Sequence, residues 1–166
     1  MFKINFKKSL LNFTIIAFIF LLDRVSKIYI LKEAELENIV DIYINPYLNF
    51  YLIWNKGIAF GMFSFSESLI YNIITLAIAS IIIIVLIMLL NTKGFRSYCF
   101  IFVAGGALGN LFDRIYYSAV PDFIDFHIND FHWFIFNVAD IFITLGIICL
   151  IFDEIFVNNK KNEKII

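Results

Sequence analysis

Residues 69–90 contain no charged side chain and are almost entirely apolar. An α-helix needs about 20 such residues to cross the hydrocarbon core of a bilayer. Three further stretches, 11–31, 97–112 and 137–157, are also mainly apolar, and 61% of all residues are hydrophobic, against about 45–50% in a soluble domain. We therefore expect a mainly α-helical membrane protein, with four transmembrane helices in a single domain, 1–166.

The apolar stretch 11–31 lacks the small-residue cleavage site of a secretory signal peptide, so we expect it to be retained. Its second half contains Asp23 and Lys27, whose spacing of four residues places them on one helical face, where they can neutralise each other. Two interpretations remain open: an internal ion pair with a lysine that snorkels to the interface, or a role beside a functional site.

Residues 40–55 alternate between apolar and polar side chains, which predicts β-strands with one apolar face. The apolar positions are Val40, Ile42, Ile44, Leu48, Phe50, Leu52 and Trp54. Asn45-Pro46 predicts a turn between two strands. An amphipathic ribbon of this kind, just outside a membrane, would lie on the lipid surface or hold a ligand there.

Basic residues indicate the orientation of the helices. They are concentrated at the N-terminus, in the turn 91–96 and in the C-terminal tail: Lys3, Lys7, Lys8, Lys93, Arg96, Lys160, Lys161 and Lys164. The other loops contain Lys56, besides Lys32 and Arg114 at helix ends. The positive-inside rule therefore predicts that both termini are cytoplasmic, and that 33–66 and 115–136 lie outside.

Two acids, two amides and an arginine lie where the third and fourth helices are expected to meet the outer interface. They are Asn110, Arg114, Asp122, Asn137 and Asp140. Ionisable groups at membrane depth are costly, so these residues are candidates for function. The alternative is that they cap helices and pair with one another.

Glycines accompany these polar residues. Gly106, Asn110 and Arg114 are four apart and share a helical face. Gly105 and Gly109 form a small-xxx-small pair, which allows another helix to approach closely. Gly57, close to Asn55, suits a tight turn, although this motif alone is weak.

Asp122 and Asp140 can act together only if the fold brings them together. Two adjacent carboxyls in a partly dry site cannot both ionise easily, so one would hold a proton while the other acts as a base toward water. We expect Asp113 to pair with Arg114 at a helix end, and Asp125 and Asp130 to be solvated loop charges.

Other hydrolytic chemistries are not supported. The sequence contains no His-Glu-x-x-His motif, and we expect His127 and His132 to be interfacial histidines without a metal. Ser26 beside Lys27 is a weak candidate for a serine nucleophile. Cys99 and Cys149 lie in apolar stretches and are expected to be packing residues.

Five blocks of sequence, in this order, resemble the lipoprotein signal peptidase (signal peptidase II) family, bacterial inner-membrane aspartic peptidases. They are Asp23 to Lys27, Asn55-Lys-Gly-Ile-Ala-Phe-Gly61, Gly106 to Arg114, Asp122-Phe-Ile-Asp125 and Asn137-Val-Ala-Asp140. Their order and spacing together are specific. The sequence departs from the family pattern at Pro121, where valine is expected, and at Ile141, where serine is common. Neither departure removes a catalytic group.

The resemblance implies four helices with a small extracytoplasmic β-cradle, and a catalytic dyad of Asp122 and Asp140. It implies that further positions bind the substrate or support the dyad: Asn55, Gly57, Asn110, Arg114, Asn137, Asp23, Lys27 and Gly106. The implied substrates are prolipoproteins whose lipobox cysteine carries diacylglycerol, cut on the N-terminal side of that cysteine. The site would lie at the outer leaflet of the bacterial cytoplasmic (inner) membrane, among membrane lipids, with no cofactor, and the chain is expected to be a monomer.

A different class of function remains as the alternative: a non-catalytic four-helix membrane scaffold or a transporter subunit. A transporter would place polar groups and broken helices near the middle of the bilayer, whereas the polar residues here cluster toward one interface. A net charge of −1 argues against binding of nucleic acid, which requires a basic face.

The charge distribution gives a direct test of topology. The end of the chain after Ile166 should lie in the cytoplasm, because the basic segments are retained on that side of the membrane. A fluorescent protein fused there should therefore fluoresce, and alkaline phosphatase fused there should be inactive. An extracytoplasmic readout would place the polar cluster in the wrong compartment.

Overall fold

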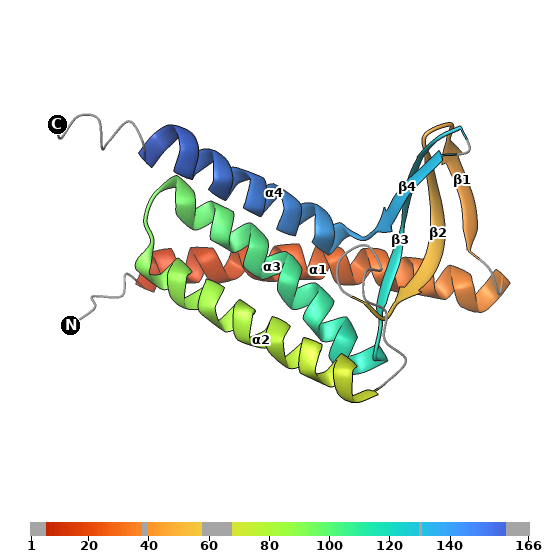
Figure 1. Ribbon diagram of the computed structural model, residues 1–166, viewed down its shortest axis with the longest axis horizontal. Helices are drawn as coiled ribbons and strands as arrows, with labels where there is room; N and C mark the ends of the chain where they lie inside the picture. Colours follow the sequence, from red (N-terminus) through yellow and green to blue (C-terminus); the bar gives the residue numbers. More distant parts are fainter. Residues whose placement is uncertain (1–5, 38–39, 58–67, 130, 159–166) are drawn as a thin grey trace.

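Four long helices and a four-stranded antiparallel sheet make up the part of the chain that the computed structural model describes, residues 6–37, 40–57, 68–129 and 131–158 (Figure 1). The helices are α1 (Phe6–Glu37), α2 (Ser68–Asn91), α3 (Phe95–Tyr117) and α4 (Val138–Phe152), and α4 continues into the π-helical segment η2 (Asp153–Asn158). The strands are β1 (Asp41–Asn45), β2 (Leu48–Asn55), β3 (Val120–Ile128) and β4 (Phe131–Phe136). The four expected helices are therefore confirmed.

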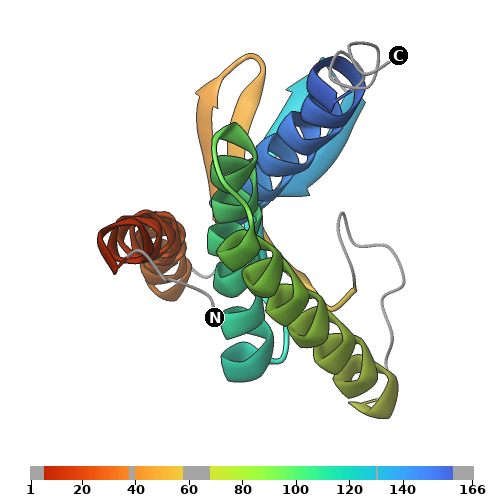
Figure 2. The same ribbon diagram turned by 90° about the vertical axis from the view of Figure 1, so that its left-hand side faces the viewer.

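Helix α3 is the centre of the bundle and contacts each of the other three helices (Figure 2). Its glycines make this close packing possible. A Cβ added at Gly105 would lie 2.9 Å from Ile19 of α1, and one added at Gly109 would lie 2.6 Å from the Asp23 carboxylate of the same helix. One added at Gly106 would collide with the Ala139 carbonyl oxygen of α4. The expected close approach at Gly105 and Gly109 is confirmed.

Two helical segments, Leu69–Asn91 and Phe95–Tyr117, are long and apolar enough to cross a membrane by length and composition. Most side chains of the first point outward, as expected for a helix that faces lipid. Helix α1 is longer, at 32 residues, but has charges in its middle, and α4 has 15 residues before η2. The start of α1 and the end of η2 lie at one end of the bundle, opposite the sheet (Figure 1).

The third helix is longer than the apolar stretch 97–112 suggests and ends only at Tyr117. Asp113 and Arg114 do not terminate it, because both are buried against neighbouring elements instead of meeting water. Likewise, α1 continues to Glu37, beyond the expected boundary near residue 31.

The strands expected in 40–55 are confirmed as β1 and β2, which pair in antiparallel fashion across a turn at Pro46 and Tyr47. The Asn45 side chain accepts a hydrogen bond from the Tyr47 N–H at 2.9 Å, which closes this turn. The expected apolar face is confirmed in part. Val40, Ile42, Phe50 and Leu52 pack with Ile30 of α1 and Phe123 of β3, whereas Ile44 and Trp54 are exposed.

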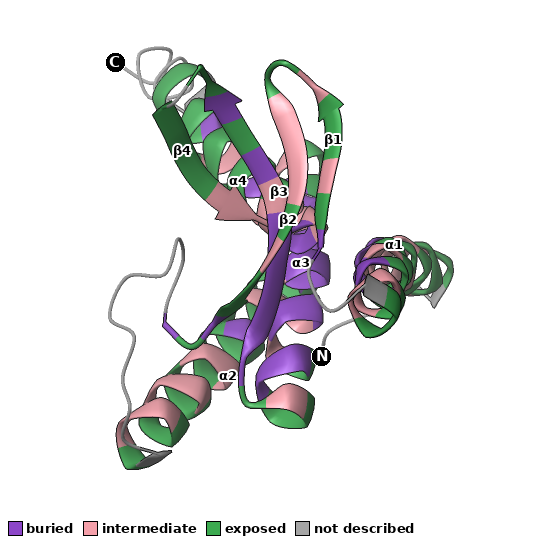
Figure 3. Cartoon of the chain, turned by 90° about the vertical axis from the view of Figure 1, so that its right-hand side faces the viewer, coloured by how far each residue is buried: buried purple, intermediate pink, exposed green. Residues whose placement is uncertain are grey.

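Strands β3 and β4 extend the sheet in the order β1-β2-β3-β4, and the sequence did not predict them. The first half of β3 is buried on both faces, so its sequence lacks the alternation that marks a half-buried strand. Figure 3 shows buried residues concentrated on α3 and on the part of β3 that approaches it. The sheet therefore presents β3 to the end of the helical bundle.

Candidate active site

Asp122 and Asp140, far apart in the sequence, line one cavity of about 280 Å³. Asp122 lies at the start of β3, and Asp140 lies in the first turn of α4. Asn55, Asn110 and Arg114 line the same cavity. The fold thus brings together the two carboxyls that sequence analysis paired.

Asparagine groups donate a hydrogen bond to every oxygen of the two carboxylates. Asp122 accepts from Asn137 Nδ2 at 2.6 Å on Oδ1 and from Asn55 Nδ2 at 2.9 Å on Oδ2. Asp140 accepts from Asn110 Nδ2 at 2.8 Å on Oδ1 and from the Asn137 backbone N–H at 3.2 Å on Oδ2. These donors are neutral, so they orient the acids without cancelling their charge.

Asn137 links the two acids because it is the N-cap of α4. Its Oδ1 accepts from the Asp140 N–H at 3.1 Å, while Asp140 accepts from the Asn137 N–H, and together they form a capping box. With Oδ1 engaged in the cap, the Nδ2 group is directed toward Asp122. The motif Asn137-Val-Ala-Asp140 is therefore both a helix start and a connection between the acids.

Lys27 fixes the orientation of Asn110. Its Nζ donates to Asn110 Oδ1 at 2.8 Å, so the amide nitrogen faces Asp140. Lys27 is fully buried, and the interpretation that it snorkels to the interface is wrong. Its role beside the site is supported by this contact.

Next to Asn110, four buried charged side chains form a cluster of ion pairs between α1 and α3. Lys27 Nζ contacts Asp23 at 2.9 Å and Asp113 at 2.6 Å. Arg24 contacts the same acids at 3.0 Å and 2.6 Å. Two positive and two negative groups therefore neutralise each other, and the expectation that Asp113 pairs with Arg114 is wrong.

The cluster also holds α4. Asp23 Oδ1 accepts a hydrogen bond from the Ala139 N–H at 3.0 Å, in the first turn of the helix that carries Asp140. Gly106 allows this turn to approach α3, because any side chain there would meet the Ala139 backbone. Gly106 and Asp23 thus act on the position of Asp140 through packing and through the backbone of α4.

Arg114 connects α3 to the turn after β2. Its Nη2 donates to the Gly57 carbonyl at 3.0 Å, and its Nη1 donates to the Asn110 carbonyl at 3.3 Å. The Gly57 N–H in turn donates to Asn55 Oδ1 at 2.8 Å, which leaves Asn55 Nδ2 directed at Asp122. The rest of the block up to Gly61 lies outside the described residues.

Burial raises the pKa of Asp122 from 3.8 to about 6, and repulsion from Asp140 adds to this rise. Hydrogen bonds from Asn55 and Asn137 act in the opposite direction, because they favour the ionised form. A pKa near 6 allows a proton to be held and released close to neutral pH. Such a pair of acids can act as base and acid in turn.

The sequence analysis missed Arg24 and Asp113 as parts of the site. The sequence feature that could have revealed them is their charge, because charged side chains within apolar helices must find partners of opposite sign.

Asp125 is also placed differently from expectation, since it is 3% exposed and contacts histidines. Asp122 and Asp125 lie three residues apart on β3, so their side chains point to opposite faces of the strand. Asp130 lies outside the described residues.

Comparisons with known proteins agree on one family. The family profile described as "Signal peptidase (SPase) II" matches residues 15–156. The chain is 60% identical over 163 residues to a lipoprotein signal peptidase of Pelagibacter ubique, covering 98% of each protein. It is 39% identical to the lipoprotein signal peptidase of Anaplasma phagocytophilum, covering 94% of this chain and 99% of that protein.

Solved structures show the same architecture. A bacterial membrane enzyme determined by the in meso method at 2.3 Å resolution matches with a TM-score of 0.69 and 29% identity, over 91% of this chain and 90% of that one. A second, at 1.9 Å resolution, matches with a TM-score of 0.66 and 30% identity, over 87% of this chain and 92% of that one.

The origin of the Asp122 pKa can be tested directly. Asp140→Asn should lower the pKa of Asp122 from about 6, because the repulsion from Asp140 is removed. It should remain above 3.8, because burial, the larger cause, persists. Carboxyl ¹³C shifts followed against pH by NMR measure this. Asp153→Asn, at the other end of α4, should leave this pKa unchanged, and an unchanged pKa in Asp140→Asn would show that the two acids do not interact.

Proposed function

This chain belongs to the signal peptidase II family of aspartic peptidases, and we propose that Asp122 and Asp140 are its catalytic pair. One observation supports this assignment above all: each of their four oxygens accepts a hydrogen bond from an asparagine, and both acids line one cavity. The enzyme is a lipoprotein signal peptidase, so its reaction is hydrolysis of a peptide bond. The alternative of a non-catalytic scaffold or transporter subunit does not agree with membership of this family.

In the proposed mechanism, the ionised carboxylate takes a proton from water as the water oxygen attacks the scissile carbonyl carbon. The other carboxyl donates its proton to the carbonyl oxygen, which gives a neutral tetrahedral diol. The C–N bond then breaks. The leaving nitrogen takes the proton that the first acid had gained, and the second acid recovers a proton from a diol hydroxyl. The pair ends with the same single proton, ready for another turnover.

The substrate is proposed to be a diacylglyceryl-modified prolipoprotein, cut on the N-terminal side of its lipobox cysteine. An apolar cavity of about 460 Å³ supports this, because Asp140 forms part of its lining. Its other lining residues are mainly aromatic or aliphatic: Phe126, Trp133, Phe134, Phe136, Ile141, Thr144 and Leu145. A cavity of this composition favours an acyl chain or an apolar peptide segment over a polar one.

The protein is a bacterial membrane enzyme. We propose that it lies in the cytoplasmic membrane as one domain and as a monomer, with the sheet and the acids at the outer leaflet and both termini in the cytoplasm. The distribution of basic residues supports this placement. The start of α1 and the end of η2 lie at the end of the bundle opposite the sheet, as expected if the sheet and the termini are on opposite sides of the membrane (Figure 1).

The dyad is tested by single and double substitution. Asp122→Asn and Asp140→Asn keep the side-chain shape but remove titration, so each protein should fold while cleavage of a diacylglyceryl-modified prolipoprotein falls by about 10³-fold or more. The double variant should be little worse, because residues that act as a unit are non-additive. Single-turnover cleavage assays measure these rates.

The matched control is Asp153→Asn, an acid in η2 at the far end of the bundle, beside Arg96. It should keep wild-type activity. Wild-type cleavage by Asp140→Asn would show that the catalytic assignment is wrong.

Arg114 offers a separate test of the support for the site. Arg114→Lys retains the charge but cannot reach both the Gly57 and Asn110 carbonyls, because lysine lacks the planar fork. The protein should fold, and activity should fall by about 10²-fold as Asn55 and Asn110 lose their alignment. Arg96→Lys, at the opposite end of α3, is the control and should be fully active. Full activity in Arg114→Lys would show that the guanidinium is not needed to align Asn55 and Asn110.

A further inference from the structure

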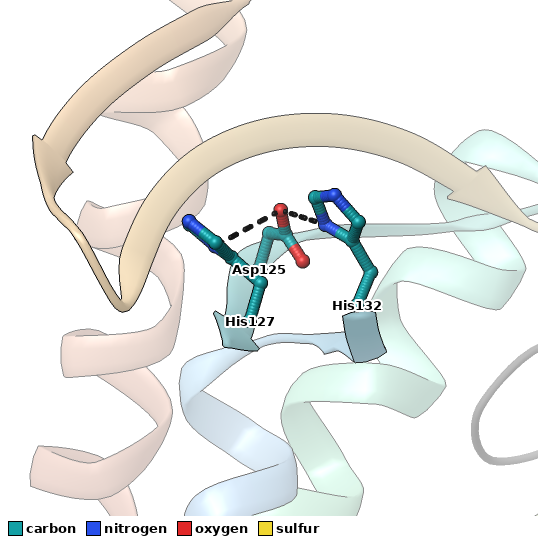
Figure 4. A group of neighbouring side chains, drawn as sticks. All are labelled: Asp125, His127 and His132. Atoms are coloured by element: carbon teal, nitrogen blue, oxygen red, sulfur yellow. Dashed lines mark hydrogen bonds and ion pairs between the residues drawn. The ribbon is translucent and has the colours of Figure 1, made fainter. Parts of the chain in front are cut away.

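Asp125, His127 and His132 converge on the β3–β4 hairpin, with their ligand atoms all within 4.8 Å of one another (Figure 4). His132 Nδ1 lies 2.8 Å from Asp125 Oδ2, and His127 Nδ1 lies 3.7 Å from the same oxygen. The register of the hairpin produces this arrangement, because His127 and His132 are direct partners across the two strands. The spacing of the two histidines in the sequence does not reveal the acid between them.

A simple hydrogen-bonded pair of Asp125 and His132 does not account for the whole cluster. Asp125 and His127 are 3% and 8% exposed, yet Asp125 Oδ1 and His127 Nδ1 have no hydrogen-bond partner within the described ranges. The buried Asn49 Oδ1, on the strand position opposite Asp125, has none either. Buried polar atoms without partners are costly, so a cation bound beside Asp125 and His127 would stabilise the hairpin by supplying a partner to both side chains.

The region has space for such a ligand. Asp125, His132 and Asn49 line a cavity of about 320 Å³, together with Asp41, Tyr51 and Ile135. This cavity shares no lining residue with the one that contains Asp122 and Asp140. The cluster is therefore distinct from the active site.

We propose that Asp125, His127 and His132 bind one divalent transition-metal ion, with zinc as the best fit. Two imidazole nitrogens and one carboxylate oxygen match the ligands that zinc takes, whereas calcium and magnesium prefer oxygen alone. Both Nδ1 atoms already face the same carboxylate oxygen, so small side-chain movements bring the three ligands around one ion. Asn49, which pairs with Asp125 across β2 and β3, lines the same cavity.

A metal here would tie β3 to β4. Asp122 lies on β3 three positions before Asp125, and β4 runs directly into Asn137, which bonds both catalytic candidates. The ion would thus stabilise the frame that carries the active site without touching the substrate. Its role is structural, and its binding is measurable independently of cleavage.

The test uses full-length protein purified without a polyhistidine tag and treated with a chelator. Cobalt(II) should bind in one equivalent per chain and give the intense visible absorption of low-coordinate cobalt, and zinc should displace it. Zinc should also raise the thermal unfolding temperature in detergent, because it binds the folded state. His132→Gln should weaken binding by at least about 100-fold and abolish the thermal shift. This substitution should not prevent folding, because the His132 side chain is 57% exposed.

Two controls make the result decisive. The double variant Asp122→Asn/Asp140→Asn should bind cobalt like the wild type, which excludes the catalytic carboxylates as the site and separates this proposal from the proposed function. Asp153→Asn should also bind normally. Absence of saturable binding, or equal binding by wild type and His132→Gln, would overturn the proposal.

Discussion

The buried cluster of Asp23, Arg24, Lys27 and Asp113 is the constraint on which the rest of the structure depends. Removing one partner from a buried ion pair costs about 3–5 kcal/mol, because the remaining charge is left without compensation. The cluster therefore fixes α1 against α3 in one arrangement. The same arrangement directs Lys27 at Asn110 and Asp23 at the first turn of α4. This set of buried charges thus helps to determine where the proposed catalytic pair lies.

Three asparagines, Asn55, Asn110 and Asn137, connect this buried cluster and the surrounding backbone to the two acids, Asp122 and Asp140. An amide has an oxygen and a nitrogen, so each asparagine can be oriented by one contact and donate through the other. Lys27 orients Asn110, the α4 cap orients Asn137 and the Gly57 N–H orients Asn55. Each leaves its amide nitrogen for a carboxylate. Cationic donors in these places would lower the pKa of the acids and leave no proton to share.

The predictable parts of the fold are those that leave a pattern along the sequence. Long apolar stretches predicted the helices, and the alternation of apolar and polar residues predicted β1 and β2. Strands β3 and β4 were missed, because β3 is buried on both faces where it starts and the pattern is lost. Asp122 and Asp140 were found from their place at an interface and from family resemblance. Arg24, Asp113 and Asp125 could not be assigned, because their partners are set by helix packing and by strand register.

The register of the strands determines where the side chains of β3 lie. A slip of one residue along β3 would turn Asp122 away from its cavity and move every side chain to the other face. Irregularities in the pairing, between Phe50 and Ile53 of β2 and between Asp125 and His127 of β3, resist such a slip, because a bulge fits only one alignment. The Asn137 cap fixes the other end of the hairpin through its bond to Asp122. One alignment thus positions both faces of β3, with the proposed catalytic Asp122 on one face and the cluster of Asp125 and His127 on the other.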